Sequence, residues 1–282
     1  TMMDMFEGEA QGCYLYSRHT NPSTSYLAKA LAEMEYTEGA ILSSSGMASI
    51  SNTLLQLCNS EDEIISSRTI YGGTYAFMKN FLTKYNIKTR FVDITKIDQV
   101  ESLINKRTKL IYCESMSNPL LEVADIKSLS ILCKKYNLKL IVDNTFTPMI
   151  FSPHKMGADI VIHSLTKFIN GSSDTVGGVI CSNEEFINEI IDVNSGTAML
   201  LGPVMDSMRA ASVLKNIRTL YLRIKQHSNN AMFLAKKFQK NGLKIIYPGL
   251  KNHPQHKMMM MSMNNDFVFG VMLVIDAQTK EK

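Results

Sequence analysis

A lysine with two nearby hydroxyl side chains follows the short apolar run 160–162. Ser164 and Thr166 immediately precede Lys167 at alternate positions. A lysine amine can condense with an aldehyde to form an imine, while serine and threonine hydroxyls can donate hydrogen bonds to a phosphate. A lone lysine in such a place is more often a surface residue at the start of a helix. The two hydroxyls instead favour a lysine that binds a phosphorylated aldehyde cofactor.

A second segment, 140–144, is an apolar run that ends in the carboxylate of Asp143. An aspartate after a strand is commonly a helix cap or a turn residue. In an enzyme that uses pyridoxal 5′-phosphate (PLP), an ionised carboxylate pairs with the pyridine nitrogen, so that the protonated ring withdraws electrons from the substrate. One connection and one apolar run separate Asp143 from Lys167. We therefore expect both residues at the same edge of neighbouring strands.

Two further segments combine glycine with polar or aromatic residues. Residues 43–48 read Ser-Ser-Ser-Gly-Met-Ala, where the N–H groups of Gly46 and Met47 at a helix start would bind an anion; a serine-capped helix without a ligand is the alternative. In residues 70–75, Tyr71 precedes two glycines that allow close approach, and its ring could lie on a flat ligand. As a lone aromatic residue, Tyr71 would more often serve packing.

The elements that position these residues alternate between short apolar runs and helix-length segments. Residues 126–136, for example, have the apolar spacing of an amphipathic helix. Nearly continuous apolar runs separated by helices indicate a parallel sheet with both faces covered, in which ligands bind beyond the carboxyl ends of the strands. We therefore predict an α/β fold with a mostly parallel seven-stranded sheet, whose strands are residues 40–42, 63–66, 89–92, 110–113, 140–142, 160–163 and 179–181.

The C-terminal third has a different pattern. Residues 203–240 predict one long connecting helix, which Gly242 and Pro248-Gly249 follow. Residues 244–246 and 267–275 read as strands of a smaller α+β domain. The methionine run 258–261 predicts only a flexible segment or a packing patch. The expected division is an N-terminal arm (1–23), a large domain (24–202), the connecting helix (203–240) and the start of a truncated small domain (241–282).

Composition narrows the class of protein. The 282 residues carry a net charge of +4, with 30 basic residues that form no dense run, so we expect no nucleic-acid partner. Five widely spaced cysteines without a Cys-x-x-Cys pair argue against a zinc site and a disulfide framework. No apolar stretch approaches the roughly 20 residues of a membrane helix. We expect a cytoplasmic protein with no metal and no membrane partner.

The candidate residues belong to an ordered series of short motifs. These are Tyr16-Ser17-Arg18 with Asn21-Pro22, Ser44 with Gly46-Met47, Tyr71-Gly72-Gly73-Thr74, Glu114-Ser115 with Asn118-Pro119, Val142-Asp143-Asn144-Thr145, and His163-Ser164 with Thr166-Lys167. The series resembles the Cys/Met-metabolism family of PLP-dependent enzymes, which have aminotransferase fold type I. Within that family, segments 1–6, 200–203, 247–250 and 253–256 are most similar to plant-type methionine γ-lyases.

The resemblance implies a role for each matching residue. Lys167 forms the Schiff base with PLP, Asp143 pairs with the pyridinium nitrogen, and Tyr71 stacks on the ring. The phosphate ligands are the amides of Gly46 and Met47 with the side chains of Ser164 and Thr166. Asn118 lies near the cofactor's 3-oxygen. Tyr16 and Arg18 reach the phosphate of a neighbouring subunit, so the chain is expected to pair with itself as a dimer or tetramer; a guanidinium grips phosphate through two parallel hydrogen bonds.

The implied reaction is γ-elimination from a sulfur amino acid. The freed Lys167 amine removes the Cα proton, a second proton leaves Cβ, and Tyr71 protonates the departing thiolate, which gives methanethiol, 2-oxobutanoate and ammonia from methionine. Two features differ from the family pattern. The arginine that binds the substrate carboxylate would lie beyond Lys282, a role that we do not assign to Arg68, so the chain reads as a piece of a longer protein. Gly73 stands where bacterial methionine γ-lyases carry a cysteine.

Three alternatives stay open. The first is a cystathionine γ- or β-lyase, or a homoserine-ester sulfhydrylase, on the same scaffold. The second is a catalytically silent PLP-binding fragment or a partner chain for a full-length subunit. The third is an α/β scaffold without a cofactor. Assays of methionine against cystathionine separate the enzymes, and a yellow protein without elimination activity would indicate the silent fragment.

Overall fold

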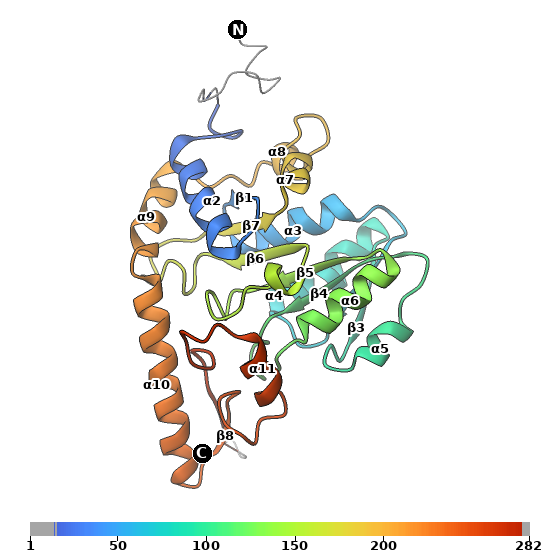
Figure 1. The fold of residues 1–282 in the computed structure, drawn as a ribbon. Coiled ribbons are helices and arrows are strands. Elements are labelled where there is room, and N and C mark those ends of the chain that lie inside the picture. The colour runs from blue at the N-terminus through green and yellow to red at the C-terminus, as the bar shows by residue number, and fades with distance from the viewer. Residues whose placement is uncertain (1–13, 15, 278–282) are drawn as a thin grey trace.

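A single seven-stranded sheet forms the centre of the molecule (Figure 1). The computed structural model describes residue 14 and residues 16–277. The strand order is β1-β7-β6-β5-β4-β2-β3, and β7 alone runs antiparallel to its neighbours. The prediction of a mostly parallel seven-stranded sheet is confirmed. The strands are β1 (Gly39–Ser43), β2 (Glu63–Ser67), β3 (Lys88–Val92), β4 (Thr108–Glu114), β5 (Lys139–Asp143), β6 (Ile160–Ser164) and β7 (Gly178–Ser182).

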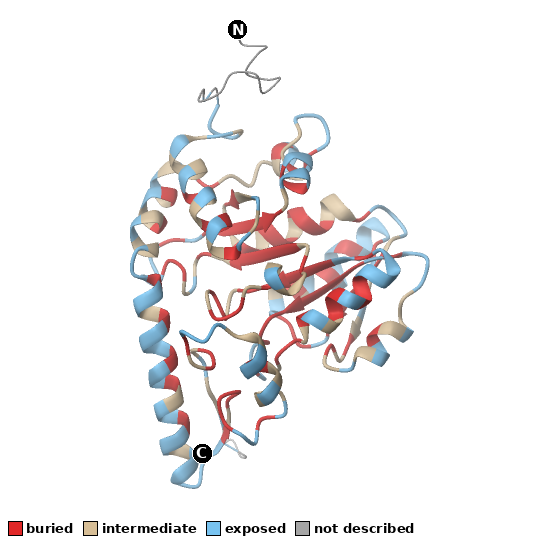
Figure 2. Cartoon of the chain, in the orientation of Figure 1, coloured by how far each residue is buried: buried red, intermediate tan, exposed pale blue. Residues whose placement is uncertain are grey.

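Both faces of the sheet are covered, as the continuous apolar strands predict. Alternate residues of β5 belong to different cores: Leu140 and Val142 pack with α2 and α6, whereas Ile141 packs with α3 and η1. Figure 2 shows the inner strands of the sheet as almost entirely buried, whereas the two edge strands are only partly buried. The helices around the sheet are α2 (Pro22–Glu35), α3 (Gly46–Leu57), α4 (Gly72–Ala76), the π-helix η1 (Phe77–Phe81), the 3₁₀-helix η2 (Leu82–Tyr85), α5 (Ile97–Ser102), α6 (Ile126–Tyr136), the 3₁₀-helix η3 (His154–Met156), α7 (Glu184–Ile190) and α8 (Thr197–Leu201).

The segment 203–240 forms two helices rather than the single predicted one. These are α9 (Ser207–Ile217) and α10 (Leu220–Lys240), which follow one another along one side of the molecule (Figure 1). At their junction, Arg223 donates to the backbone oxygens of Asn216 and, across the chain, of Phe168 and Ile169. The break therefore serves a tertiary contact with the turn just after Lys167.

The C-terminal part pairs β8 (Lys244–Ile246) with β9 (Val274–Asp276) in an antiparallel ribbon. The predicted strand 267–275 is wrong except at its end. Gly270 adopts a left-handed backbone with a φ of 56°, and its carbonyl oxygen accepts a 3.0 Å hydrogen bond from the Tyr247 hydroxyl, so this stretch folds back instead of extending. The methionine run lies in the short helix α11 (His256–Ser262), with Met259 buried in the core.

A buried hydrogen-bonded pair, Glu35 and His163, lies on the face of the sheet that α2 covers. Glu35 of α2 accepts a 2.7 Å hydrogen bond from Nε2 of His163 on β6, and a 3.1 Å bond from the amide of Asn144. Both Glu35 and His163 are fully buried. Since His163 precedes Ser164 and Asn144 follows Asp143, this pair fixes α2 to two strands that carry candidate site residues.

Replacing Glu35 with alanine should lower the free energy of unfolding by about 3–5 kcal/mol, because it leaves His163 and Asn144 buried without their acceptor. Urea denaturation would measure the change. Glu33→Ala is the matched control: Glu33 is exposed on the same helix, and its loss should change the free energy by no more than about 0.5 kcal/mol. Equal losses of stability in the two variants would contradict a stabilising role for the hydrogen bonds of Glu35 to His163 and Asn144.

Among the described residues, no helix is both long enough and apolar enough to cross a membrane.

Candidate cofactor site

Three polar side chains stand at the ends of adjacent strands. Glu114, Asp143 and Ser164 are the last residues of β4, β5 and β6, which lie next to one another in the sheet. Glu114 is the register partner of Asp143. Parallel strands lie about 4.8 Å apart, so these three residues line one short edge of the sheet. The expected convergence at the carboxyl edge is therefore present for Asp143 and for the segment that leads to Lys167.

Asp143 is a buried carboxylate that carries hydrogen bonds but no cation. Its Oδ1 accepts from the backbone N–H of Thr145 at 3.0 Å, and its Oδ2 accepts from the Tyr112 hydroxyl at 3.3 Å. Within the described part of the chain it forms no salt bridge with a lysine or arginine. Burial raises the pKa of Asp143, because a desolvated negative charge is unfavourable. A cationic ring nitrogen at this carboxylate would supply the missing charge.

The start of α3 closes onto the end of β6. Ser45 caps the helix by accepting from the Ala48 N–H at 3.1 Å, and the first turn contains no acidic residue. A Cβ added to Gly46 would lie 2.7 Å from the Cβ of Ser164, so only glycine allows this approach. The first N–H groups of a helix have no acceptor within it and attract anions. The helix start and the Ser164 hydroxyl therefore form a site that fits the phosphate of PLP.

The backbone around Lys167 is held while its side chain is exposed. The Lys167 carbonyl accepts from the N–H of Gly171 at 2.9 Å, and Arg223 donates to the next two carbonyls at 2.5 and 2.9 Å. The Thr166 hydroxyl accepts from the Gly177 N–H at 3.2 Å. The Thr166 hydroxyl, which was expected to bind the phosphate together with that of Ser164, therefore already accepts a hydrogen bond from the chain's own backbone. In the single chain, the amine of Lys167 faces solvent.

Tyr71 lies at the start of α4, near the start of α3. A Cβ on Gly73 would lie 2.6 Å from the Tyr71 ring and 3.3 Å from the sulfur of Met47, so the ring occupies the space above Gly73. The Tyr71 side chain is half exposed. The structure thus brings Tyr71 close to Met47, as a ring that stacks over a phosphate-bound cofactor requires. It also gives a reason for glycine at position 73, since any side chain there would displace the tyrosine ring.

Glu114 connects two loops and was not among the predicted site residues. Its Oε1 accepts from the backbone N–H of Tyr71 at 2.6 Å, and its Oε2 accepts from the backbone N–H of Asn118 at 3.2 Å. Asn118 begins the cis peptide bond to Pro119. The sequence held one signal for this role: like Asp143, Glu114 is a carboxylate that directly follows a run of buried strand residues.

Two acidic groups thus share one buried edge, which should appear in the pH dependence of stability. Burial, and then the neighbouring Asp143, raise the pKa of Glu114 from 4.5 to about 8. The folded chain therefore keeps a proton that the unfolded chain has released. The cofactor-free protein should lose stability as pH rises from about 4.5 to about 8, by up to about 1.4 kcal/mol per pH unit from this group.

Urea denaturation of the wild type and of Glu114→Gln at several pH values would measure this effect. Asp143 contributes a loss of the same sign in both proteins, because its pKa is also raised, and Tyr112 titrates only above its ordinary range. The stability of the variant relative to the wild type should therefore increase with pH across the window. A difference that does not vary with pH would contradict the raised pKa.

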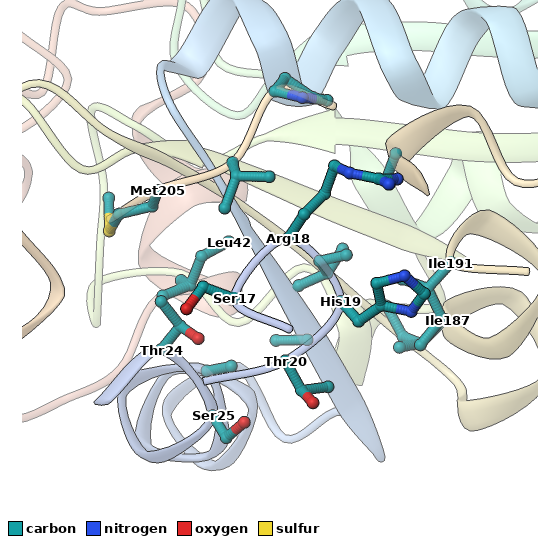
Figure 3. A pocket seen from close by; sticks show the side chains of 16 residues that line it. Ser17, Arg18, His19, Thr20, Thr24, Ser25, Leu42, Ile187, Ile191 and Met205 are labelled. Atoms are coloured by element: carbon teal, nitrogen blue, oxygen red, sulfur yellow. The ribbon is translucent and has the colours of Figure 1, made fainter. Parts of the chain in front are cut away.

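Arg18 and Tyr16 lie apart from these residues within the single chain. One terminal nitrogen of Arg18 donates to the backbone oxygen of Met199 at 2.9 Å, next to Gly202. Arg18 lines a pocket of about 110 Å³, together with other residues of segment 17–20 and residues of α2, β1, α7, α8, 203–205 and Ile191 (Figure 3). Neither Asp143 nor Lys167 lines this pocket. The expectation that Tyr16 and Arg18 act on a neighbouring subunit stays a prediction, and segments 1–13 and 278–282 lie outside the described residues.

Arg68, which was not assigned the role of the carboxylate-binding arginine, forms surface ion pairs. Its guanidinium lies 3.0 Å from carboxylate oxygens of both Asp93 and Glu122. These contacts give Arg68 a structural role between β2 and the loop after β4.

The chain is similar in sequence to curated enzymes along most or all of its length. The chain is 43% identical to methionine gamma-lyase of Arabidopsis thaliana over 100% of its own length and 65% of the relative. It is 39% identical to cystathionine beta-lyase of Lactococcus lactis, with 92% of this chain and 67% of the relative aligned. The chain thus spans about two thirds of the length of these curated relatives.

Two solved structures share the fold. The crystal structure of metB from Corynebacterium glutamicum has a TM-score of 0.91 at 32% identity, over 98% of this chain and 71% of that chain. Cystathionine gamma-lyase from Lactobacillus plantarum, complexed with L-serine, has a TM-score of 0.89 at 30% identity, over 95% of this chain and 69% of that chain. All 282 residues match the sequence profile described as Cys/Met metabolism PLP-dependent enzyme. This chain belongs to that family of PLP-dependent enzymes of sulfur amino-acid metabolism.

Proposed function

We propose that this protein is a PLP-dependent carbon–sulfur lyase that converts methionine and water to methanethiol, 2-oxobutanoate and ammonia. The observation that carries the PLP assignment is the buried, cation-free carboxylate of Asp143 beside the α3 start and the Lys167 segment. The choice of methionine rests on the 43% identity to the Arabidopsis thaliana methionine gamma-lyase along the whole chain.

The residues that would hold PLP come from five segments of the chain and one segment of a neighbouring copy. Lys167 would supply the amine for covalent attachment, and the Asp143 carboxylate would accept a hydrogen bond from the protonated ring nitrogen. Tyr71 would cover one face of the ring, and Asn118 would lie near its 3-oxygen. The phosphate would be bound by the N–H groups of Gly46 and Met47 with the hydroxyls of Ser164 and Thr166. Tyr16 and Arg18 would complete the phosphate site of a neighbouring copy in a dimer or tetramer.

The chain's own residues then handle the protons. PLP supplies the electron sink that stabilises negative charge at the substrate Cα. The Lys167 amine would remove the Cα proton, from a turn whose backbone is held by the Gly171 N–H and by Arg223. A second proton leaves Cβ, the Cγ–S bond breaks, and the Tyr71 hydroxyl donates a proton to the departing thiolate. Asp143 would keep the ring nitrogen protonated throughout, because its carboxylate is buried and, among the described residues, forms no salt bridge with a lysine or arginine.

Cystathionine is the second candidate substrate. It is favoured by identities of 39% to the Lactococcus lactis cystathionine beta-lyase and 37% to the Bacillus subtilis cystathionine gamma-lyase, over 92% and 95% of this chain. Gly73 also differs from the cysteine that the resemblance leads one to expect in a bacterial methionine γ-lyase. The scaffold therefore suits elimination from either thioether.

The test is an absorbance titration of the chain with PLP, followed by assays with each thioether. We expect a visible band from the bound cofactor, release of methanethiol and 2-oxobutanoate from methionine, and slower release of cysteine from cystathionine. Faster turnover of cystathionine would replace the proposed substrate. A chain that binds PLP but releases no thiol and no keto acid from either compound would contradict the lyase activity.

A further inference from the structure

One carboxylate joins the two loops that flank the proposed cofactor site. The loop after β2 carries Tyr71, and the loop after β4 carries Asn118. Glu114, at the end of β4, accepts one backbone N–H from each, at 2.6 Å through Oε1 and at 3.2 Å through Oε2. The Glu114 residue is 9% exposed, so water does not readily replace either bond.

Among the described residues, Glu114 has no lysine or arginine partner, so it is not one half of a buried ion pair. Glu63, at the opposite end of β2, is also buried, but it binds Arg90 at 2.6 Å and the Asn105 amide at 2.8 Å. Among the described residues, Glu114 is assigned only the two backbone N–H donors, and its register partner is another acid, Asp143. A buried acid beside a like charge is unfavourable for the fold, which indicates a role in the site.

We propose that Glu114 is a positioning residue for the cofactor, which sets the Tyr71 loop and the Asn118 loop at a fixed separation across the ring. The inference rests on the proposed function, because it assumes that PLP occupies the edge formed by Asp143 and the start of α3. Glu114 touches neither cofactor nor substrate in this scheme and acts through the backbone of the two loops.

The chemistry of the group explains why an acid stands here. A carboxylate presents an acceptor on each oxygen, so it satisfies both N–H groups at once, and hydrogen bonds to a charged acceptor are roughly twice as strong as neutral ones. A glutamine amide keeps one acceptor but directs an NH₂ group at the other N–H. One loop would then lose its bond and face a like donor. A bound cationic ring nitrogen at Asp143 would also reduce the cost of a second negative charge beside it.

The test compares Glu114→Gln with Glu63→Gln, which removes one charge from the other end of the same layer. The chain contains 11 tyrosines and no tryptophan, so quenching of tyrosine fluorescence reports PLP binding to the cofactor-free protein. Visible circular dichroism of the bound cofactor reports how rigidly the ring is held. The titrations are done about one pH unit above the pKa of about 8, where Glu114 is ionised.

Glu114→Gln should weaken PLP binding by about 10- to 100-fold and reduce the visible dichroism per bound cofactor, while the Tm of the cofactor-free protein does not fall. Glu63→Gln should lower that Tm and leave both cofactor readouts unchanged. Glu114→Asp keeps the charge on a shorter side chain that can still reach one loop, so its affinity should lie between those of the wild type and Glu114→Gln. It also carries the test if the glutamine variant does not fold.

Wild-type affinity and dichroism in Glu114→Gln would overturn the inference. So would an equal loss of cofactor affinity in Glu63→Gln, since it would show that the effect follows from general destabilisation. A wild-type chain that binds no PLP would instead contradict the proposed function, so the two failures are distinguishable.

Discussion

Replacing Lys167 with alanine is expected to abolish covalent retention of PLP and to reduce thiol release from methionine by at least about 10²–10⁴-fold, the usual contribution of a positioned base. The amine has two proposed tasks, attachment of the cofactor and removal of the Cα proton. The variant should fold as the wild type does, because the Lys167 side chain is exposed and only its backbone is bonded, to Ser164 and Gly171. Thiol assay and visible absorbance measure the two losses.

Lys127→Ala serves as the matched control, since Lys127 is another exposed lysine, on α6 and away from the strand ends. It should retain wild-type absorbance and turnover. Adding a small primary amine such as methylamine to Lys167→Ala should restore part of the rate if the lost group is a base. Full activity in Lys167→Ala without added amine would contradict its assignment.

Asp143→Asn should affect the cofactor-free and the PLP-bound protein in opposite directions. Burial raises the pKa of Asp143, so the unpaired carboxylate destabilises the fold, and a neutral amide of similar shape should leave the free energy of unfolding unchanged or higher. Removal of the partner of a buried cation should weaken PLP binding by roughly 10²- to 10³-fold. Turnover should fall further, because the ring nitrogen is no longer kept protonated.

The control for Asp143 is Asp159→Asn, at the opposite end of the same strands. Asp159 accepts the N–H of Leu140 at 2.8 Å and lies 3.8 Å from the amine of Lys139. Its replacement should lower stability slightly and leave PLP affinity unchanged. Urea denaturation and PLP titration of both variants would decide the matter. An Asp143→Asn protein that binds PLP as tightly as the wild type would show that this carboxylate does not face the ring nitrogen.

The sheet edge could be predicted because its determinants are local. The buried strands are continuous apolar runs, and each predicted run lies within one observed strand; β5 and β6 extend theirs to Asp143 and Ser164. In a parallel arrangement, polar residues that end neighbouring strands must meet at one edge. The sequence pattern thus sufficed to bring Asp143 and the Lys167 segment together.

The features that sequence missed depend on contacts between distant segments. In the sequence, nothing indicates a partner for Glu114. Its bond to the Tyr71 loop depends on the pairing of β2 with β4, and its bond to Asn118 depends on the fold of the loop after β4. No proline or glycine marks the break between α9 and α10 in the sequence. The break lies where Arg223 of α10 donates to the turn after Lys167, a contact between segments far apart in the chain. The predicted strand 267–275 had suitable side chains, but the left-handed backbone of Gly270 interrupts it.

The most direct test of the account is reduction of the PLP-treated chain with borohydride, followed by proteolysis and mass mapping of the modified peptide. We predict a single phosphopyridoxyl group on Lys167, in the peptide that contains Ser164 and Thr166. A label on any other lysine, or no stable label after reduction, would contradict the assignment of this strand edge as a PLP site.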